Sequence, residues 1–172
     1  NSFIAIAPVS DMTRFKLKGI DVVWELADKF DSCSFTIVGL SKSVSNRIKK
    51  KPKNLEIYSQ MSQGELKDYL FKSEFVLQLS ISEGFPNSLC EAMLCECIPI
   101  GSSVGGIPNI IDKAGYIIKK SNFKHIENEF KQIIRISLKK RLELGKKARE
   151  RVIENFHISK RERLFLDLIR DN

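Results

Sequence analysis

The order of hydrophobic and polar positions along the 172-residue chain predicts alternating strands and helices. Short apolar runs bounded by Gly, Pro or polar residues have the length of buried strands. Six such runs are found: Phe3–Val9, Ser34–Val38, Leu55–Tyr58, Phe75–Leu79, Ile98–Gly101 and Tyr116–Ile118. Between them, apolar residues recur at helical spacing in 19–30 and 87–96, and Ser62 with Glu65 is typical of a capping box that opens a helix.

Strands that alternate with helical stretches favour parallel pairing through right-handed crossovers. The strands are almost continuously apolar, as expected for a sheet covered on both faces. We therefore expect one Rossmann-like, doubly wound α/β domain over residues 1–172, with an α/β core in 1–120 and C-terminal helices in 121–172. Ligands of such sheets bind beyond the carboxyl ends of the strands. Four loops lie there: 10–18, 59–62, 81–87 and 102–108.

Composition narrows the classes of function. With 42% hydrophobic and 29% charged residues, the chain has the composition of a globular protein. It contains neither a P-loop nor a G-x-G-x-x-G fingerprint, which argues against an ATPase and an NAD enzyme. Its four cysteines do not form a zinc-binding set. We expect Cys90, Cys95 and Cys97 to pack as small apolar residues, with reduced thiols, in a cytoplasmic protein.

Positive charge is concentrated in the last third of the chain. Residues 1–112 carry 12 basic and 13 acidic side chains, whereas residues 113–172 carry 17 and 8. This excess leaves two interpretations open: a solvated helical face, or a non-enzymatic basic module that binds anionic membrane or RNA. Aromatic residues are not interleaved with the basic ones, which argues against RNA.

The segment SEGFPNSLCE, residues 82–91, carries the strongest chemical signal. Glu83 is expected in the loop after the fourth strand, and Glu91 just over one turn into the next helix. Between them lie the free amides of a helix N-terminus, which attract anions and hydroxyl oxygens. Carboxylates that accept from hydroxyl groups, beside amides that donate to oxygens, suit a polyol attached to a phosphate.

This segment resembles the E-x7-E signature of the retaining glycosyltransferases of group 1 (family 4), in its EGFPN variant. Further motifs of that family follow in order over nearly the whole chain: Lys18-Gly19, Gly39, Glu91-Ala92-Met93, Ile98-Pro99-Ile100, Gly105-Gly106-Ile107-Pro108 and Gly115 to Ile118. The resemblance implies the second Rossmann-like half of a glycosyltransferase B-type architecture, the nucleotide-sugar donor domain. The N-terminal acceptor domain is expected to be absent from this chain.

The resemblance also implies roles for individual residues. Glu91 would hold the ribose hydroxyls of the nucleotide, Glu83 would contact hydroxyls of the donor sugar, and Lys18 would neutralise the diphosphate as the glycosidic bond breaks. Arg14, or alternatively Lys16, would supply a second positive charge. The other expected donor-binding residues are Gly84, Phe85, Pro86, Asn87, Ser88, Gln60, Met61, Gly105 and Gly106. Of these, Gln60 and Met61 would lie near the base.

We therefore expect a retaining, hexosyltransferase-type enzyme that uses a nucleoside-diphosphate sugar and no metal or other cofactor. Its acceptor would be a saccharide or a lipid-linked molecule in cell-surface polysaccharide or glycolipid synthesis, with contact at the inner face of the cell membrane left open. The chain alone is expected to be inactive without its acceptor domain. It departs from the family pattern at Pro86 and Glu96, where Gly is common, and at Asn109, where Glu is common.

Overall fold

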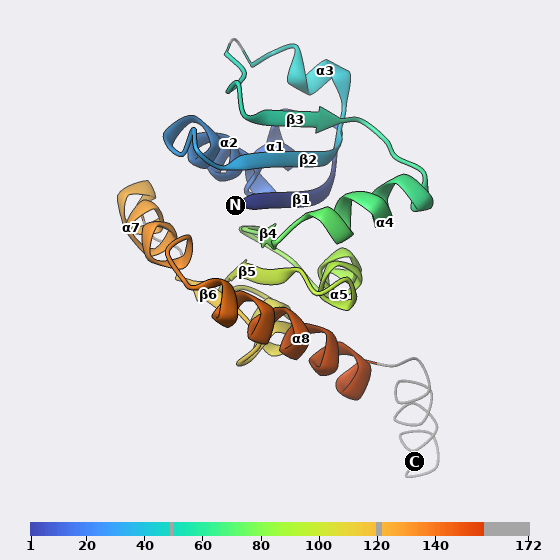
Figure 1. The fold of residues 1–172 in the computed structure, drawn as a ribbon. Helices are drawn as coiled ribbons and strands as arrows, with labels where there is room; N and C mark the ends of the chain where they lie inside the picture. Colours follow the sequence, from blue (N-terminus) through green and yellow to red (C-terminus); the bar gives the residue numbers. More distant parts are fainter. Residues whose placement is uncertain (49, 120–121, 157–172) are drawn as a thin grey trace, which may run out of the picture.

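The computed structural model describes residues 1–48, 50–119 and 122–156. Six parallel strands form one sheet in the order β3-β2-β1-β4-β5-β6, stacked in that order from top to bottom in Figure 1. The strands are β1 (Ser2–Val9), β2 (Ser34–Leu40), β3 (Leu55–Tyr58), β4 (Phe75–Gln78), β5 (Ile98–Ser102) and β6 (Tyr116–Ile118). The chain proceeds outward from β1 to one edge and then from β4 to the other, which confirms the predicted doubly wound, Rossmann-like fold.

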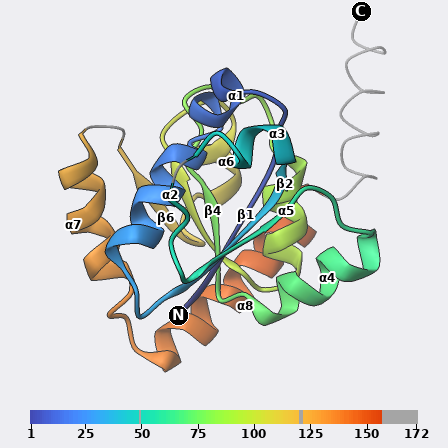
Figure 2. The ribbon, with the colours of Figure 1, turned by 90° about the horizontal axis from the view of Figure 1, so that it is seen from above.

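Helices cover both faces of the sheet (Figures 1 and 2). They are α1 (Met12–Leu17), α2 (Ile20–Lys29), α3 (Lys42–Ser45), α4 (Gln63–Lys72), α5 (Asn87–Leu94), α6 (Ile107–Ile111), α7 (Phe123–Ile133) and α8 (Leu138–Asn155). The predicted capping box at Ser62 and Glu65 is present at the start of α4. None of the helices within the described ranges is both long and apolar enough to cross a membrane.

Two segments that the sequence predicts as loops contain short helices. In the first, α1, the Asp11 side chain accepts a hydrogen bond from the Arg14 amide at 2.8 Å and so caps the helix. The second, α6, begins at Ile107 with Pro108 in its first turn, where a missing amide hydrogen costs nothing. Both helices are shorter than two turns, and hydrophobic periodicity does not detect elements of that length.

The core is divided by the sheet into two clusters of buried side chains. On one face, the Phe3 ring lies 4.8–5.0 Å from the ring centroids of Phe35, Phe75 and Phe130, so that α7 is stacked onto the centre of the sheet. On the other face, Ile4 and the α5 side chains meet small residues of α8. Alternate residues of β1 point to opposite faces, which explains why the strand is apolar throughout.

Glu96 ends helix α5 in a left-handed conformation, with φ of 65°. The Glu96 amide donates to the Met93 carbonyl at 3.0 Å, and the Cys97 amide donates to the Ala92 carbonyl at 3.1 Å. This pair of bonds is a Schellman motif, whose left-handed residue is usually glycine. The departure from the family pattern at Glu96 therefore falls where the backbone favours glycine.

Helix α8 runs along the outside of the domain from one end of the sheet to the other (Figure 1). Near its start, Arg141 Nη1 donates to Glu74 Oε1 at 2.7 Å, beside the beginning of β4. Beyond its end, the Phe156 ring lies 5.4 Å from the Phe85 ring, at the carboxyl end of the sheet. A Cβ at Gly145 would lie 2.6 Å from the Glu96 carbonyl oxygen, so glycine permits this close packing against the end of α5. The part of the predicted C-terminal helices that follows residue 156 lies outside the described residues.

Candidate functional site

The predicted ligand-binding loops meet at the carboxyl end of the sheet. Figure 2 shows this end at the top, where α1, α3 and α6 gather. Backbone hydrogen bonds join the loops directly: the Ile81 amide donates to the Leu17 carbonyl at 2.7 Å, and the Gly106 amide donates to the Gly84 carbonyl at 2.8 Å. Three segments that are distant in sequence thus form one surface.

Two glycines allow this close approach. Gly19 has a φ of 67°, and a Cβ built there would lie 2.0 Å from the Leu79 carbonyl oxygen. Gly105 has a φ of 53°, and its Cβ would lie 1.7 Å from the Glu83 carbonyl oxygen. Both distances are far inside van der Waals contact, so each position requires glycine. The predicted site residue Gly105 therefore shapes the loop that carries Glu83.

Lys18 and Glu83 form an ion pair at the centre of this surface. Lys18 Nζ lies 2.7 Å from Glu83 Oε2, and the two side chains are 21% and 14% exposed. Lys18 immediately follows α1 and precedes Gly19, the N-cap residue of α2. Partial burial reduces screening by solvent, so this pair is electrostatically stronger than one on the open surface.

Buried polar side chains at the end of β4 form hydrogen bonds with the Glu83 carboxylate. Gln78 Nε2 and Ser80 Oγ each lie 3.3 Å from Glu83 Oε2, and Gln78 Nε2 also donates to Ser80 Oγ at 2.9 Å. Ser102 Oγ donates to the Ser80 carbonyl at 2.6 Å. Gln78, Ser80 and Ser102 are the buried polar side chains of the described core. None of the three was among the expected site residues, although a polar residue at the end of an apolar strand marks each of them in the sequence.

The two carboxylate oxygens of Glu83 differ in their hydrogen-bond partners. Lys18, Gln78 and Ser80 all approach Oε2. Oε1 has no hydrogen-bond donor among the described residues. The carboxylate is therefore held through one oxygen, and the other remains an acceptor for a ligand hydroxyl group.

Helix α5 begins beside this carboxylate. Its N-cap residue is Pro86, which has no capping side chain, and the Leu89 amide donates to the Pro86 carbonyl at 3.1 Å. The amides of Asn87 and Ser88 have no acceptor within the part of the chain that the structure describes. Free amides at a helix start, with the positive end of its dipole, form an anion-binding position.

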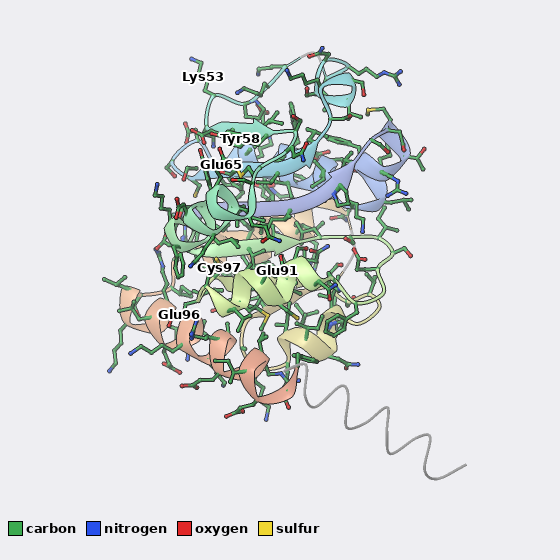
Figure 3. All side chains as sticks on the ribbon, turned by 90° about the vertical axis from the view of Figure 1, so that its right-hand side faces the viewer. Lys53, Tyr58, Glu65, Glu91, Glu96 and Cys97 are labelled. Atoms are coloured by element: carbon green, nitrogen blue, oxygen red, sulfur yellow. The ribbon has the colours of Figure 1, made fainter. Side chains whose placement is uncertain are left out.

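Glu91 lies one turn further along α5, where its side chain is exposed (Figure 3). Among the described residues it makes no ion pair or hydrogen bond, in contrast to Glu83. Phe85 is 48% exposed and is held on one side by the Phe156 ring. The structure therefore places both predicted glutamates on the segment that bounds the α5 N-terminus, one fixed by partners and one available to a ligand.

The second predicted cation lies beside a separate hollow. Arg14 and Gln60 both line a depression of about 430 Å³ at the carboxyl ends of β1, β2 and β3, together with Ser10, Gly39 and Ser41. The Arg14 side chain is exposed and lies 3.9 Å from the Asp11 carboxylate. Met61 does not line this hollow and instead packs against the core on the α4 and α5 side. Arg14 and Gln60 thus lie beside the same hollow, whereas Met61 faces elsewhere.

The cysteines have the environment of packing residues. Cys33, Cys90 and Cys97 are buried, Cys95 is partly buried, and all four are free thiols. Burial, with a smaller contribution from the Glu91 carboxylate, raises the pKa of the Cys90 thiol to about 11, and burial raises the pKa of Cys97 to about 12. Thiols with raised pKa values are weak nucleophiles at neutral pH. This environment matches the predicted packing role.

The parallel sheet in the order β3-β2-β1-β4-β5-β6, with its loops gathered at the carboxyl end, defines a Rossmann-like α/β domain. Residues 12–151 match the sequence profile of the family described as "Glycosyl transferases group 1". Because this match covers most of the chain, the chain belongs to the group 1 glycosyl transferases.

Curated relatives share about a third of the residues that align. Trehalose synthase of Thermococcus litoralis is 39% identical over 104 residues, which cover 56% of this chain and 23% of that protein. N-acetyl-alpha-D-glucosaminyl L-malate synthase of Bacillus anthracis is 32% identical over 130 residues, which cover 70% of this chain and 34% of that protein. The aligned part thus spans about a quarter to a third of these relatives' length.

Solved structures share the fold over nearly the whole chain. A glycosyltransferase from Rickettsia africae has a TM-score of 0.81 at 19% identity, covering 99% of this chain and 47% of that one. HepE of Anabaena, in complex with UDP-glucose, has a TM-score of 0.79 at 14% identity, covering 99% and 49%. The C-terminal domain of a group 1 glycosyl transferase (LpcC) from Francisella tularensis has a TM-score of 0.69 at 19% identity, covering 91% and 87%. The chain therefore has the fold of one half of the glycosyltransferase B-type architecture.

Proposed function

We propose that this chain is the donor-binding domain of a retaining glycosyltransferase and that it binds a nucleoside-diphosphate sugar at the carboxyl end of its sheet. The observation that carries the proposal is the Lys18–Glu83 ion pair beside the free amides of α5. It sets a positive charge, a hydroxyl acceptor and amide donors next to one another. A diphosphate joined to a sugar presents groups complementary to all three.

Each part of the site has a distinct task in this proposal. Glu83 Oε1 accepts from a sugar hydroxyl group while Oε2 stays bound to its three partners. The amides of Asn87 and Ser88 donate to oxygens of the sugar or the phosphate. Lys18 stabilises the negative charge that develops on the diphosphate as the glycosidic bond breaks, which is electrostatic stabilisation by a group already in place.

The nucleoside occupies the remaining positions of the site. Glu91 accepts from the ribose hydroxyls, since its exposed carboxylate has no partner among the described side chains. The base lies toward the hollow lined by Arg14 and Gln60. Arg14 supplies a second positive charge for the phosphates from the same side.

Transfer requires a second domain in this proposal. The chain aligns with about half of each of two solved glycosyltransferase chains, and the acceptor is a saccharide or a lipid-linked molecule that the other half recognises. The relatives are named as synthases of trehalose and of N-acetyl-alpha-D-glucosaminyl L-malate, which supports a hydroxylated acceptor. We expect the isolated domain to bind its donor without transferring the sugar.

Isothermal titration of the chain with UDP, GDP and ADP, free and as sugar conjugates, tests the proposal. One nucleotide should bind, and Glu91→Ala should weaken its binding by about 1.5–3 kcal/mol, the scale of a hydrogen bond to a charged group. Glu96→Ala is the matched control, because Glu96 is an exposed glutamate at the opposite end of α5 (Figure 3). Equal affinity of wild type and Glu91→Ala would remove the ribose role of Glu91.

A further inference from the structure

The outer side of helix α8 carries a continuous stripe of apolar and basic side chains. The stripe, called the α8 stripe below, consists of Leu138, Lys139, Leu142, Lys146, Arg149 and Ile153, all of which are exposed. Their spacing of three, four or one residue places them on one side of the helix. An adjacent side of α8 is buried against the domain through Leu144, Ala148 and Val152. The stripe is therefore a second face and does not belong to the core.

Exposed apolar surface is concentrated here. Seven large apolar side chains are exposed in the described part of the chain, and four of them lie on the stripe or beside it: Leu138, Leu142, Ile153 and Phe71. Leu138 is 68% exposed, Phe71 is 60% exposed and Leu142 is 59% exposed. Phe71, at the end of α4, lines the same hollow of about 450 Å³ as the two leucines. The patch is continuous across two helices, unlike the scattered single apolar residues of an ordinary surface.

The charges around these apolar side chains are mainly positive. Lys139, Lys146 and Arg149 lie within the stripe, and Lys67 Nζ lies 5.8 Å above the Phe71 ring. The Arg149 guanidinium is anchored by a hydrogen bond to the Leu94 carbonyl. Of the carboxylates in the hollow, Glu74 is neutralised by Arg141 at 2.7 Å, which leaves Glu96.

The acidic residues of α8 lie on the flank of the stripe. They are Glu143, Glu150 and Glu154, and Glu143 is paired with Lys140 at 2.8 Å. The stripe itself therefore contains three positive charges and no carboxylate. Basic side chains interspersed with exposed leucines are characteristic of a surface that lies in the headgroup region of an anionic bilayer.

We propose that the α8 stripe, together with Phe71, docks this domain on an anionic lipid bilayer. The apolar side chains enter the boundary between headgroups and acyl chains, and the basic side chains contact phosphate groups. The Lys18–Glu83 pair lies on loops that contribute nothing to the stripe. Docking through α8 therefore leaves the carboxyl end of the sheet open. The proposal does not depend on the identity of the donor.

Co-sedimentation of the 172-residue chain with vesicles tests this proposal. Vesicles of phosphatidylcholine with about one third phosphatidylglycerol should bind the chain, vesicles of phosphatidylcholine alone should bind it much less, and salt should weaken the binding. Lys139→Glu with Lys146→Glu should lower the partition coefficient by about 30-fold or more, from about 1 kcal/mol for each basic side chain. Leu138→Ser with Leu142→Ser should also weaken it, without a change of charge.

A control pair of substitutions distinguishes the effect of the α8 stripe on vesicle binding from the effect of net charge. Lys29→Glu with Lys53→Glu makes the same change of charge at the opposite edge of the domain, where Figure 3 shows Lys53. This control should retain more than half of the binding, and circular dichroism should show that every variant is folded. Equal losses in the control and stripe variants would overturn the proposal, as would equal binding to neutral vesicles. A dimer in light scattering that Leu138→Ser with Leu142→Ser dissociates, without vesicle binding, would instead make the stripe a contact between copies.

Discussion

Lys18 Nζ lies 2.7 Å from Glu83 Oε2, although the two residues are 65 positions apart in the sequence. The pairing depends on the close approach of the Lys18–Gly19 turn to the end of β4, which only glycine permits at position 19. The ion pair fixes the position of the Lys18 ammonium group before any ligand binds. Such preorganisation is the main source of electrostatic stabilisation in enzymes.

Replacing Lys18 tests its proposed contact with the diphosphate. Lys18→Met should weaken binding of the nucleoside diphosphate by about 1.5–3 kcal/mol and should change binding of the corresponding nucleoside little, because the nucleoside has no phosphate. Calorimetry with both ligands measures the difference. Lys29→Met, at the exposed carboxyl end of α2, is the control. Equal losses for nucleoside and diphosphate would argue against a phosphate contact.

The buried hydrogen bonds to Glu83 predict that a substitution can weaken binding of the sugar without weakening binding of the nucleotide. Gln78→Leu removes a donor from Glu83 Oε2 while keeping an apolar side chain of similar size in the core. We expect the affinity for the nucleotide sugar to fall by about 1 kcal/mol, the typical net value of one hydrogen bond, and the affinity for the free nucleotide to stay the same. Ser102→Ala is the control, because Ser102 bonds to the Ser80 carbonyl and does not reach the carboxylate.

Two glycines of adjacent loops should respond very differently to alanine. At Gly105, an added Cβ meets the Glu83 carbonyl oxygen at 1.7 Å, and φ is 53°. Gly105→Ala should therefore lower the free energy of unfolding by about 2 kcal/mol or more, from left-handed strain and a steric clash. At Gly84, nothing lies within 4 Å of an added Cβ, so Gly84→Ala should change stability by less than about 1 kcal/mol. Urea denaturation compares the two, and similar losses would contradict the loop geometry described above.

The helix end at Glu96 offers a stabilising substitution. Glu96 has a φ of 65° within a Schellman motif. Glu96→Gly removes left-handed strain of about 1–2 kcal/mol and adds about 0.5–1 kcal/mol of backbone entropy to the unfolded chain. We expect a net gain of about 0.5–1 kcal/mol, seen in thermal denaturation as a rise in Tm of about 1–4 °C. An unchanged or lower Tm would mean that the Glu96 side chain itself stabilises the fold.

The Glu74–Arg141 pair should make stability depend on pH. Burial raises the pKa of Glu74, but the Arg141 guanidinium and the Ser2 amide outweigh it and hold the pKa below its usual value. A lowered pKa means that folding favours the ionised form, so this contribution is present above the pKa of the unfolded chain, about 4.3, and is lost as the pH falls through the folded value. Arg141→Met should therefore be less stable than wild type at pH 7. Urea denaturation between pH 7 and pH 3 should show the difference shrinking, and a constant difference would exclude this pair as its cause.

Sequence patterns alone predicted the six strands, the parallel doubly wound sheet and the positions of the long helices. A strand that is buried on both faces is apolar along its whole length, and a helix that is buried on one side has apolar residues at regular helical spacing. Both patterns are visible in the sequence. The prediction failed at α1 and α6, whose lengths are 6 and 5 residues. Such short helices depend on a cap or on a proline in the first turn and leave no periodic signal.

At the site, the sequence alone determined which chemical groups lie at the carboxyl end of the sheet, because every loop that follows a parallel strand leads there. Glu83, Glu91 and the α5 amides were expected there on that basis, whereas Lys18 was indicated by the resemblance to the glycosyltransferase family, and the roles of all of them in donor binding stay predictions. Only the tertiary structure decided that Lys18 pairs with Glu83, that Gln78 and Ser80 hold the same oxygen, and that Met61 turns toward the core. These contacts join residues brought together by the crossovers, and their geometry depends on close packing that no local pattern encodes.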